Sequence, residues 1–443
     1  MRKFFTILLI AALPSLCLAQ YRCFFGNLHA HTSYSDGQST PDTAFAYAKN
    51  VARVDIQALT EHNNGQPYTI SPENYQNLRL IADTMTIPGV FVALAGFEIG
   101  SMGSSGFGHL NVWETATLSP YFNTTGDLLN CYKWIKEQGC PALFNHPDSG
   151  RYQNSNFNDL YYYQDYQQAM DLIEILNGGT LYEDAYLRAL ERGWRLGPSA
   201  NQDNHQRDWG NRISNGNIPL TGVWADTLTK PAILEALNAR RTTALEVSPA
   251  SDRFLLSLKV DGRWQGSTIL RQQGEADFEI SARSDTSAFR KIYLYSNGSI
   301  VDSLSPGTRV VNWTFKRQLK SGSQYFFAKA VQNDSDRAWT SPVFIDVYAE
   351  NRYQVYTWPT PVRDQAKIIY PPLEGANQLN VRIYDLAGNL IWSREDAVPG
   401  QAVDWDVRDR CQRPVPNGLY IIMVQIRSPQ ETKSYSGKTM VTR

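Results

Sequence analysis

The sequence predicts an α/β domain followed by two β-sandwich modules. From Cys23 to about Ala250, short apolar runs alternate with amphipathic stretches, as strands and helices do around a parallel sheet. After Ala250, apolar and polar residues alternate with a period of two. The chain has 443 residues, more than one hydrophobic core usually serves. We therefore expect a leader at 1–19, the α/β domain at 20–250, and β-sandwich modules at 251–348 and 349–443.

The first 19 residues carry the features of a cleaved signal peptide. Met1-Arg2-Lys3 is basic, the run from Phe4 to Leu13 is apolar, and Cys17-Leu18-Ala19 precedes Gln20. This order predicts export, and it argues against the alternative of a short buried helix. The mature protein is expected to be secreted, periplasmic or on the cell surface. No later apolar run reaches the ~20 residues that span a bilayer.

The α/β domain is expected to contain seven strands with helices between them. The predicted strands are Cys23 to Leu28, Val54 to Thr60, Val90 to Phe97, Pro141 to Asn145, Leu172 to Leu176, Leu196 to Ala200 and Gly222 to Ala225. Helices are expected at Pro41 to Arg53, Pro72 to Met85, Asp127 to Gln138 and Lys230 to Arg240. Gly139 would close the third helix, and Thr229 is a possible N-cap of the fourth.

Both later modules show strand-like alternation and contain no histidine. The strands of the first are expected at Phe254 to Val260, Ala276 to Ala282, Lys291 to Tyr295 and Tyr325 to Val331. Those of the second are expected at Leu379 to Asp385, Ala402 to Trp405 and Leu419 to Ile426. Their carboxylates have no ligand-like spacing, so any chemistry is expected in the first domain.

Charge and cysteine content exclude several classes of function. Lysine and arginine number 42 against 43 aspartates and glutamates, so the chain has no general electrostatic preference for nucleic acid or acidic membranes. Cys23, Cys131, Cys140 and Cys411 would remain after cleavage, too few for a disulfide scaffold. Cys131 and Cys140 pair only if the chain turns back at Gly139, and free thiols are an equal alternative.

All six histidines fall in short motifs next to predicted strands or a glycine-rich loop. The motifs are Asn27-Leu28-His29-Ala30-His31 with Ser35-Asp36-Gly37, Thr60-Glu61-His62, Gly96-Phe97-Glu98, Gly108-His109-Leu110-Asn111, Asn145-His146-Pro147 and Asp203-Asn204-His205. Because the ends of barrel strands gather distant side chains on one face, these groups are expected to converge. Imidazole combined with carboxylate suits zinc, iron or manganese better than calcium. A hydrogen-bonded loop residue is the alternative for any single histidine, but six together predict a multinuclear metal site.

On these motifs, the region from Tyr21 to Ala250 resembles the PHP (polymerase and histidinol phosphatase) superfamily of metallohydrolases. His29-Ala30-His31 with Ser35-Asp36-Gly37 is similar to its first motif, Thr60-Glu61-His62 to its second, Gly96-Phe97-Glu98 to its third and Asp203-Asn204-His205 to its last. The resemblance implies a distorted seven-stranded (β/α) barrel that holds two or three divalent transition metals.

The resemblance also implies which residues hold each metal. The first would take His29, His31, Glu98 and Asp203, the second Asp36, His62 and His205, and the third Glu98, His109 and His146. One position departs from the family, in which aspartate usually precedes the residue that corresponds to His62. Here that position is Glu61.

A centre of this kind suits hydrolysis, because clustered cations lower the pKa of a shared water and stabilise an anionic transition state. We expect a phosphoesterase that acts on a small molecule, with a metal-bridging hydroxide as nucleophile and His205 or Glu61 as the acid. Arg207, Arg212 and Arg241 flank the last motifs and are candidates to bind the substrate anion, unless they are ordinary surface arginines. Glu174 and Asn177 could orient ligands from behind or satisfy loop backbone.

Two other functions stay open. The Ser35-Asp36-Gly37 variant resembles an extracytoplasmic subgroup that includes carbamate and ester hydrolases, and the stretch from Gln332 to Pro342 is similar to the β module after their barrels. The bond would then be a carbamate, ester or amide, with the aromatics from Tyr152 to Tyr166 as a pocket wall or as ordinary packing. The other alternative is a non-catalytic surface binding protein.

The C-terminal module resembles the immunoglobulin-like domain of flagellar hook-capping proteins. The likeness rests on Pro359-Thr360-Pro361-Val362, Ile383 to Gly388, Trp405-Asp406 and Asn417 to Tyr420. It implies a sorting domain read by secretion machinery, and a plain β-sandwich spacer is the alternative.

Overall fold

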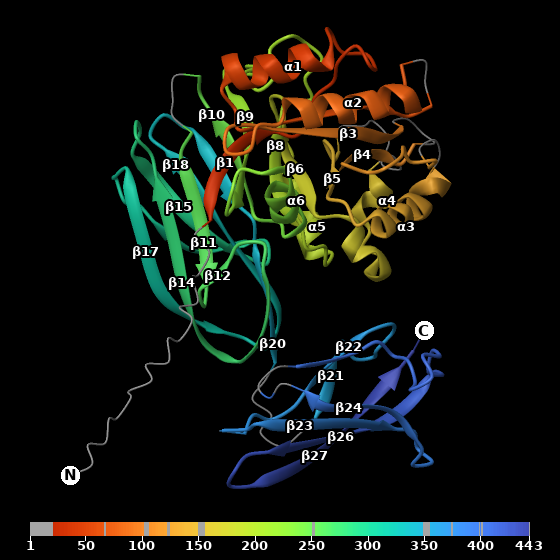
Figure 1. Cartoon of the computed structure of the whole chain (residues 1–443). Coiled ribbons are helices and arrows are strands. Elements are labelled where there is room, and N and C mark those ends of the chain that lie inside the picture. The colour runs from red at the N-terminus through yellow and green to blue at the C-terminus, as the bar shows by residue number, and fades with distance from the viewer. Residues whose placement is uncertain are drawn as a thin grey trace, which may run out of the picture.

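The computed structural model shows a mixed α/β protein with one large sheet and three separate antiparallel sheets. It describes residues 21–65, 68–101, 106–121, 125–148, 156–249, 253–348, 355–373, 375–397, 399 and 402–442. In Figure 1 the helix-covered barrel is red to yellow-green, the middle β module beside it is green to teal, and the C-terminal β module is blue. None of the helices within these ranges is long and apolar enough to cross a membrane.

The parallel strands of the barrel form two groups. The first is β1 (Arg22–Asn27), β2 (Ile56–Asn63) and β3 (Val92–Ser101). The second is β5 (Ala142–Phe144), β6 (Leu172–Asn177) and β8 (Gly197–Asn201), and β7 (Thr180–Leu181) makes a hairpin with β6. β4 (Gly108–Trp113) joins the groups by antiparallel pairing with β3 and β5. β4 was not among the predicted strands, and His109, expected just after a glycine-rich loop, is its second residue.

Side-chain hydrogen bonds join β8 to β1 and so close the barrel. The N–H of Leu28 donates to Oδ1 of Asn201, and the N–H of Gln202 donates to Oδ1 of Asn27, both at 3.0 Å. Beyond the strands, the N–H of His31 donates to the carbonyl of Asn204 at 2.9 Å. This seam places the first and last histidine motifs side by side.

Two antiparallel strands extend the sheet from β1 into the middle module. They are β9 (Ile218–Ala225) and β10 (Thr242–Val247). The run Gly222 to Ala225, expected in the parallel set, is thus antiparallel to β1, and β10 was not predicted. β10 pairs with β19 (Arg337–Thr340), so the sheet and the buried core both continue past residue 250.

Four helices follow the predicted spans closely, whereas the helices at Phe157–Leu160 and Glu183–Glu191 were not predicted. The helices are α1 (Pro41–Tyr47), which continues as a π-helical turn at Ala48–Ala52, α2 (Pro72–Met85), α3 (Leu128–Gln138), α4 (Phe157–Leu160), α5 (Glu183–Glu191) and α6 (Lys230–Asn238), with 3-10 turns at Thr125–Asp127 and Gln164–Ala169. Gly139 closes α3 with φ 64°. The Thr229 side chain does not cap α6, because its hydroxyl lies 3.3 Å from that of Thr227 instead.

The middle module is two packed sheets. One is β12 (Arg263–Trp264), β11 (Leu255–Val260), β14 (Gly274–Arg283) and β17 (Val310–Leu319). The other belongs to the large sheet and contains β16 (Ser299–Leu304), β15 (Phe289–Ser296), β18 (Gly322–Gln332), β20 (Val343–Tyr348) and β13 (Thr268–Gln272).

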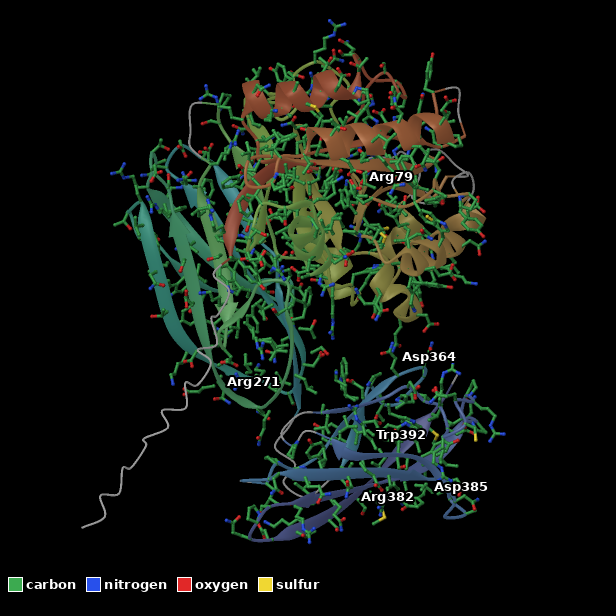
Figure 2. All side chains as sticks on the ribbon, in the orientation of Figure 1. Arg79, Arg271, Asp364, Arg382, Asp385 and Trp392 are labelled. Carbon is green, nitrogen blue, oxygen red and sulfur yellow. The ribbon has the colours of Figure 1, made fainter. Side chains whose placement is uncertain are left out.

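The C-terminal module has its own core. Its sheets are β21 (Tyr356–Trp358), β22 (Ala366–Ile369) and β25 (Val403–Trp405), and β24 (Leu390–Ala397), β23 (Gln378–Tyr384), β26 (Gly418–Arg427) and β27 (Thr432–Val441). Trp405, Ile383 and Ile422 are buried between them. Figure 2 shows Asp364 at the edge of this module that faces the barrel, and Trp392 farther from the barrel. The four cysteines of the described chain are all free thiols.

Candidate metal centre

Nine side chains converge in three overlapping clusters, at the carboxyl ends of the parallel barrel strands and the amino end of antiparallel β4. The clusters are His29, His31, Glu98 and Asp203, then His31, Asp36, His62 and His205, then Glu98, His109 and His146. Within each, the candidate ligand atoms lie within 4.8 Å of one another. The sequence motifs put His31 in the first cluster alone, whereas the structure places it between the first two. Glu98 likewise joins the first cluster to the third.

Local backbone geometry explains how the first motif supplies three of these groups. His29 and His31 follow β1 and project to the same side through the two-residue period of an extended chain. The chain then turns back at Gly37, whose N–H donates to the carbonyl of Thr32 at 2.9 Å. A Cβ on Gly37 would lie 2.5 Å from the carbonyl carbon of His31, so only glycine allows the turn that returns Asp36 to the site.

The spacing of the donor atoms fits bound transition metals. Two ligands that are each about 2.1 Å from one ion lie roughly 3 to 4 Å apart. Nε2 of His29 is 3.3 Å from Oδ1 of Asp203 and 3.4 Å from Oε1 of Glu98. In the second cluster, Oδ1 of Asp36 is 3.4 Å from Nε2 of His62 and 3.2 Å from Nε2 of His205.

Several donor atoms of the clusters are buried without a hydrogen-bond partner. Within the described chain, these atoms include Nε2 of His29, Nδ1 of His31, Nδ1 of His62, Nδ1 of His109 and Oε2 of Glu98. Nδ1 of His62 and Nδ1 of His109 do lie 3.0 and 2.9 Å from oxygens of Glu98, but without hydrogen-bond geometry. A buried polar atom without a hydrogen bond costs about 1–3 kcal/mol, so this group of donor atoms calls for a ligand. Nitrogen with carboxylate oxygen is the donor set of zinc, iron or manganese.

The carboxylates of the centre are held ionised. Burial by itself raises the pKa of Glu98, but His109, His29 and other neighbouring histidines outweigh it and hold that pKa well below its usual range. The pKa values of Asp36 and Asp203 are lowered in the same way, because their histidine partners outweigh burial. Three negative charges therefore surround the place where cations would bind, from buried Glu98, half-buried Asp203 and exposed Asp36.

The imidazoles divide into two kinds. Burial lowers the pKa of His31 to about 3, although Asp203 and Glu98 act in the opposite direction. For His62, burial is outweighed by Glu98 and Asp36, which raise its pKa to about 10. Metal ions bind the neutral imidazole, so a cation would take the place of the proton at His62.

Glu174 holds two of the histidine ligands from behind. Its Oε1 accepts from Nδ1 of His29 at 2.9 Å and from Asn201 at 3.0 Å. Its Oε2 accepts from the N–H of His146 at 2.6 Å and from Asn177 at 2.8 Å. The hydrogen bond from the N–H of His146 supports an unusual backbone conformation, because His146 is left-handed with φ 24°, which is uncommon for histidine.

Asn145 is a supporting residue whose role the sequence did not reveal. Its Nδ2 donates to Oε1 of Glu98 at 2.8 Å and to Oδ1 of Asn111 at 2.9 Å. Asn145 and Asn111 both belong to the histidine motifs. An asparagine close to each histidine was the one feature of the sequence that could have pointed to this supporting role.

Glu61 lies below the loop that carries His31 and Asp36. It is fully buried, and both of its carboxylate oxygens accept hydrogen bonds, one from the N–H of Thr32 at 3.1 Å and from the hydroxyl of Ser35, the other from the hydroxyl of Thr32. Burial raises its pKa, although Ser35 and Thr32 act in the opposite direction. These contacts favour a role in positioning the loop over a role as acid.

The three arginines expected to bind substrate do not come together in one place. Arg207 is exposed two residues after His205, and Arg212 lies 3.6 Å from Asp208. Arg241 stands at the amino end of the barrel, where its Nη1 donates to Glu235 at 3.0 Å and its guanidinium lies 4.3 Å from the ring centroid of Tyr21. The antiparallel course of β9 and β10 places Arg241 at the end of the barrel opposite the metal clusters.

The expected aromatic wall lies away from the metal clusters where it is described. Tyr152 falls outside the described residues. Tyr163 and Tyr166 pack against Tyr132 of α3 with ring centroids 6.2 and 6.1 Å apart, and Tyr162 meets Trp194 edge-on at 5.4 Å. These rings form packing between helices and the loop before β8.

Comparison with known proteins adds structural likenesses but no family. No family model and no curated protein matches the sequence. A two-domain protein from Bacteroides vulgatus that contains a predicted PHP-like metal-dependent phosphoesterase is similar at 18% identity, over 73% of this chain and 96% of that one, with a TM-score of 0.43.

Two further solved structures are similar over part of the chain. The fibronectin(III)-like modules of Clostridium thermocellum CbhA match at 16% identity over 42% of this chain and 94% of theirs, with a TM-score of 0.19. A two-domain fibronectin type-III segment of chicken tenascin matches at 10% identity over 42% and 99%, with a TM-score of 0.17. All of these TM-scores are low, and the chemistry proposed below rests on the geometry of this chain's own side chains.

Proposed function

We propose that the protein is an exported metal-dependent hydrolase that cleaves a phosphoester bond in a small molecule. The observation that supports this most strongly is the position of Glu98. This buried carboxylate joins two ligand clusters and is within 3.4 Å of five of the six histidines. One carboxylate shared between adjacent clusters suits two or three cations close together.

The residues of the chain divide the work of such a reaction. Bound divalent metals would supply an activated water and neutralise charge on the phosphoryl group. Asp36, Glu98 and Asp203 would hold the cations in place through their ionised carboxylates. His205 is the histidine side chain most open to solvent, at 31%, whereas Glu61 is fully buried. Of the two, only His205 could reach a leaving oxygen, and it could protonate that oxygen only while its imidazole is not bound to a cation.

A second candidate is hydrolysis of a carbamate, carboxylic ester or amide. Two of the three arginines expected to recognise phosphate are engaged by Glu235 and Asp208, which leaves less positive charge for a phosphate than the sequence suggested. A neutral carbonyl substrate needs no such charge.

A substrate screen tests the proposal. The mature chain would be loaded with manganese, zinc or iron and assayed on aryl phosphate mono- and diesters, aryl carbamates and aryl esters. We expect phosphoester turnover that is lost in His29→Ala and kept in Glu183→Gln, a matched change at a carboxylate that pairs with Lys329 outside the three clusters. Turnover of carbamates or esters without phosphoesters would establish the second candidate instead.

Metal analysis separates both enzymes from a binding protein. Expression in metal-supplemented medium should give two or three transition-metal ions per chain. Less than one ion per chain, with no turnover, would favour a non-catalytic surface protein whose β modules do the recognition.

Export and sorting have a separate test. We propose that cleavage leaves Gln20 as the first residue and that the C-terminal module directs the protein to secretion machinery. N-terminal sequencing of exported protein, with and without residues 349–443, checks both points. Normal export of the shortened chain would leave the module as a spacer.

A further inference from the structure

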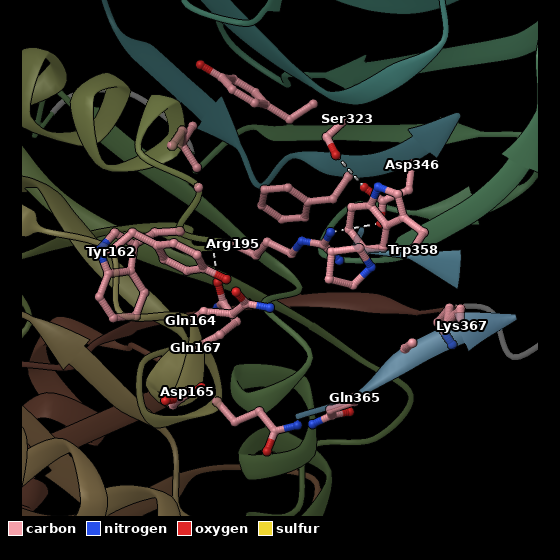
Figure 3. A pocket seen from close by; sticks show the side chains of 18 of the residues that line it. Tyr162, Gln164, Asp165, Gln167, Arg195, Ser323, Asp346, Trp358, Gln365 and Lys367 are labelled. Atoms are coloured by element: carbon pink, nitrogen blue, oxygen red, sulfur yellow. Dashed lines mark hydrogen bonds and ion pairs between the residues drawn. The ribbon is translucent and has the colours of Figure 1, made fainter. Parts of the chain in front are cut away.

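A cavity of about 860 Å³ lies where the barrel, the middle module and the C-terminal module meet. The barrel contributes Tyr162 and Gln164, the middle module Ser323, and the C-terminal module Trp358 and Gln365 (Figure 3). The volume is in the range of about 300–1,000 Å³ that small-molecule sites occupy.

This cavity is separate from the metal centre. Its residue Arg195 lies two residues before the start of β8, whereas Asp203 and His205 follow that strand. The cavity and the metal clusters therefore lie at opposite ends of the barrel. Whatever binds in the cavity does not meet the metals.

The cations of the cavity wall already have partners. Nη2 of Arg195 is 2.8 Å from Oδ2 of Asp346, and Nζ of Lys367 is 2.7 Å from Oδ1 of Asp404. Nζ of Lys136 donates to a main-chain carbonyl at 2.9 Å. Because these positive charges are engaged, the wall offers little attraction to a phosphate or a sulfate.

Two carboxyl groups add negative charge where two modules meet. Asp165 of the barrel and Asp364 of the C-terminal module both line the cavity. Hydrogen bonding to Asp364 raises the pKa of Asp165, as expected for two carboxyl groups in contact. An anionic ligand would be repelled by this pair.

The rest of the lining includes aromatic rings and side-chain amides. The guanidinium of Arg195 lies 5.9 Å from the ring centroid of half-buried Trp358, and Tyr162 is held edge-on against Trp194. Six amide side chains line the cavity, among them Gln164 and Gln365. Gln167, Gln324 and Asn297 each already use one amide atom in a hydrogen bond to the backbone. An amide both donates and accepts hydrogen bonds, as a sugar hydroxyl does.

We propose that this cavity binds a neutral oligosaccharide. The C–H face of a sugar ring would lie on Trp358 or Tyr162, and its hydroxyls would exchange hydrogen bonds with the amides and with the acidic pair. Held aromatic rings provide contact area at little cost in conformational entropy. A ligand bound there would touch all three modules, and the site is independent of the proposed hydrolysis.

The test uses the full mature chain and a glycan array, followed by titration with the neutral trisaccharides that bind. We expect at least one neutral ligand with a Kd of about 1 mM or tighter. Trp358→Ala and Gln365→Ala should each weaken it about tenfold or more. Gln425→Ala, an exposed amide on β26 outside the lining, is the matched control and should leave the Kd unchanged.

Gln365→Ala protects the test from a folding artefact, because Gln365 is exposed and its loss removes no core contact. Tighter binding of uronic acid or sulfated glycans than of their neutral counterparts would overturn the proposal. So would unchanged affinity in both variants, or an array without any bound neutral glycan. Binding of a proline-rich peptide in place of sugars would also overturn it, since the same rings could serve that ligand.

Discussion

The two ends of the barrel both bury charged side chains, but they balance the charge differently. At the amino end, Asp171 accepts from the N–H of Ala142 at 3.3 Å and lies 3.6 Å from Nη1 of Arg240. At the carboxyl end, Glu98 and Asp203 face imidazoles, and Nε2 of His29 has no hydrogen-bond partner in the described chain. The chain itself balances the amino end, whereas the carboxyl end is left for a ligand to complete.

This contrast explains why burial alone does not identify the site. Asp171 and Glu98 are both nearly inaccessible, at 6% and 1%. They differ in their surroundings, because Asp171 has an arginine that remains charged at any ordinary pH. Glu98 has histidines, which release a proton when a metal binds. Four variants break or sharpen the comparison.

Glu98→Gln should have the largest effect. It removes the negative charge that two clusters share, so the protein should lose at least two of its metal ions. Turnover should fall by about 1,000-fold or more, since metals supply several kcal/mol of transition-state stabilisation. Metal analysis and the substrate assay measure both effects, with Glu183→Gln as the matched control. A full metal complement in Glu98→Gln would show that metal binding at the carboxyl end does not depend on the negative charge of Glu98.

Glu174→Gln should have a smaller effect on metal binding at the carboxyl end of the barrel. The amide keeps the shape, but its NH₂ group would face either Nδ1–H of His29 or the N–H of His146, which both donate to Glu174. Loss of such support typically lowers metal affinity 10–100-fold. Competition with a chelator measures the affinity, and Asn177→Ala, which removes one of the four bonds, should cost less. Equal affinities in wild type and Glu174→Gln would reduce Glu174 to a packing role.

The sequence located the ligands because barrel topology brings strand ends together. His29, His62 and Asp203 stand at or just after β1, β2 and β8, so a list of strand ends was enough to group them. His31 was harder to assign to one metal. Its place between two clusters depends on the turn at Gly37, which brings Asp36 close.

Other features depend on pairing that no local pattern encodes. Arg241 is close in sequence to the last motif, but β9 and β10 reverse direction and carry it to the amino end. β4 was also missed, although its residues alternate between polar and apolar. The continuation of the sheet into the middle module arises from β10 and β19, whose partners are about 95 residues apart in sequence and leave no periodic signal.

Asp171→Asn tests the charge balance at the amino end of the barrel through the pH dependence of stability. Burial raises the pKa of Asp171 to about 7, although Arg240 and the N–H of Ala142 act in the opposite direction. An unfolded aspartate titrates near about 3.9. The folded chain thus holds the proton more tightly, and this contribution to stability is complete below about pH 4 and lost as the pH rises through 7.

The asparagine variant cannot lose that proton. Its free energy of unfolding relative to wild type should therefore improve from pH 5 to pH 8, by about 1 to 3 kcal/mol. Urea unfolding at both pH values measures this change, and any constant loss of the Arg240 contact cancels in the difference. Asp83→Asn, at an exposed aspartate, should show no such trend. A difference that is independent of pH would mean that Asp171 is ionised in the fold.

Arg241→Gln should have the smallest effect, and none on catalysis. Its guanidinium donates to the carbonyl of Trp224 at 3.0 Å and pairs with Glu235, which is 63% exposed, so the ion pair itself is well screened. We expect the free energy of unfolding to fall by about 1 to 2 kcal/mol, mainly through the buried hydrogen bond. KM and kcat should not change, whereas Arg207→Gln, beside His205, should raise KM if a substrate anion passes over that loop. A raised KM in Arg241→Gln would contradict this expectation. It would mean that a change at the amino end of the barrel affects substrate binding at the opposite end, where His29 lies.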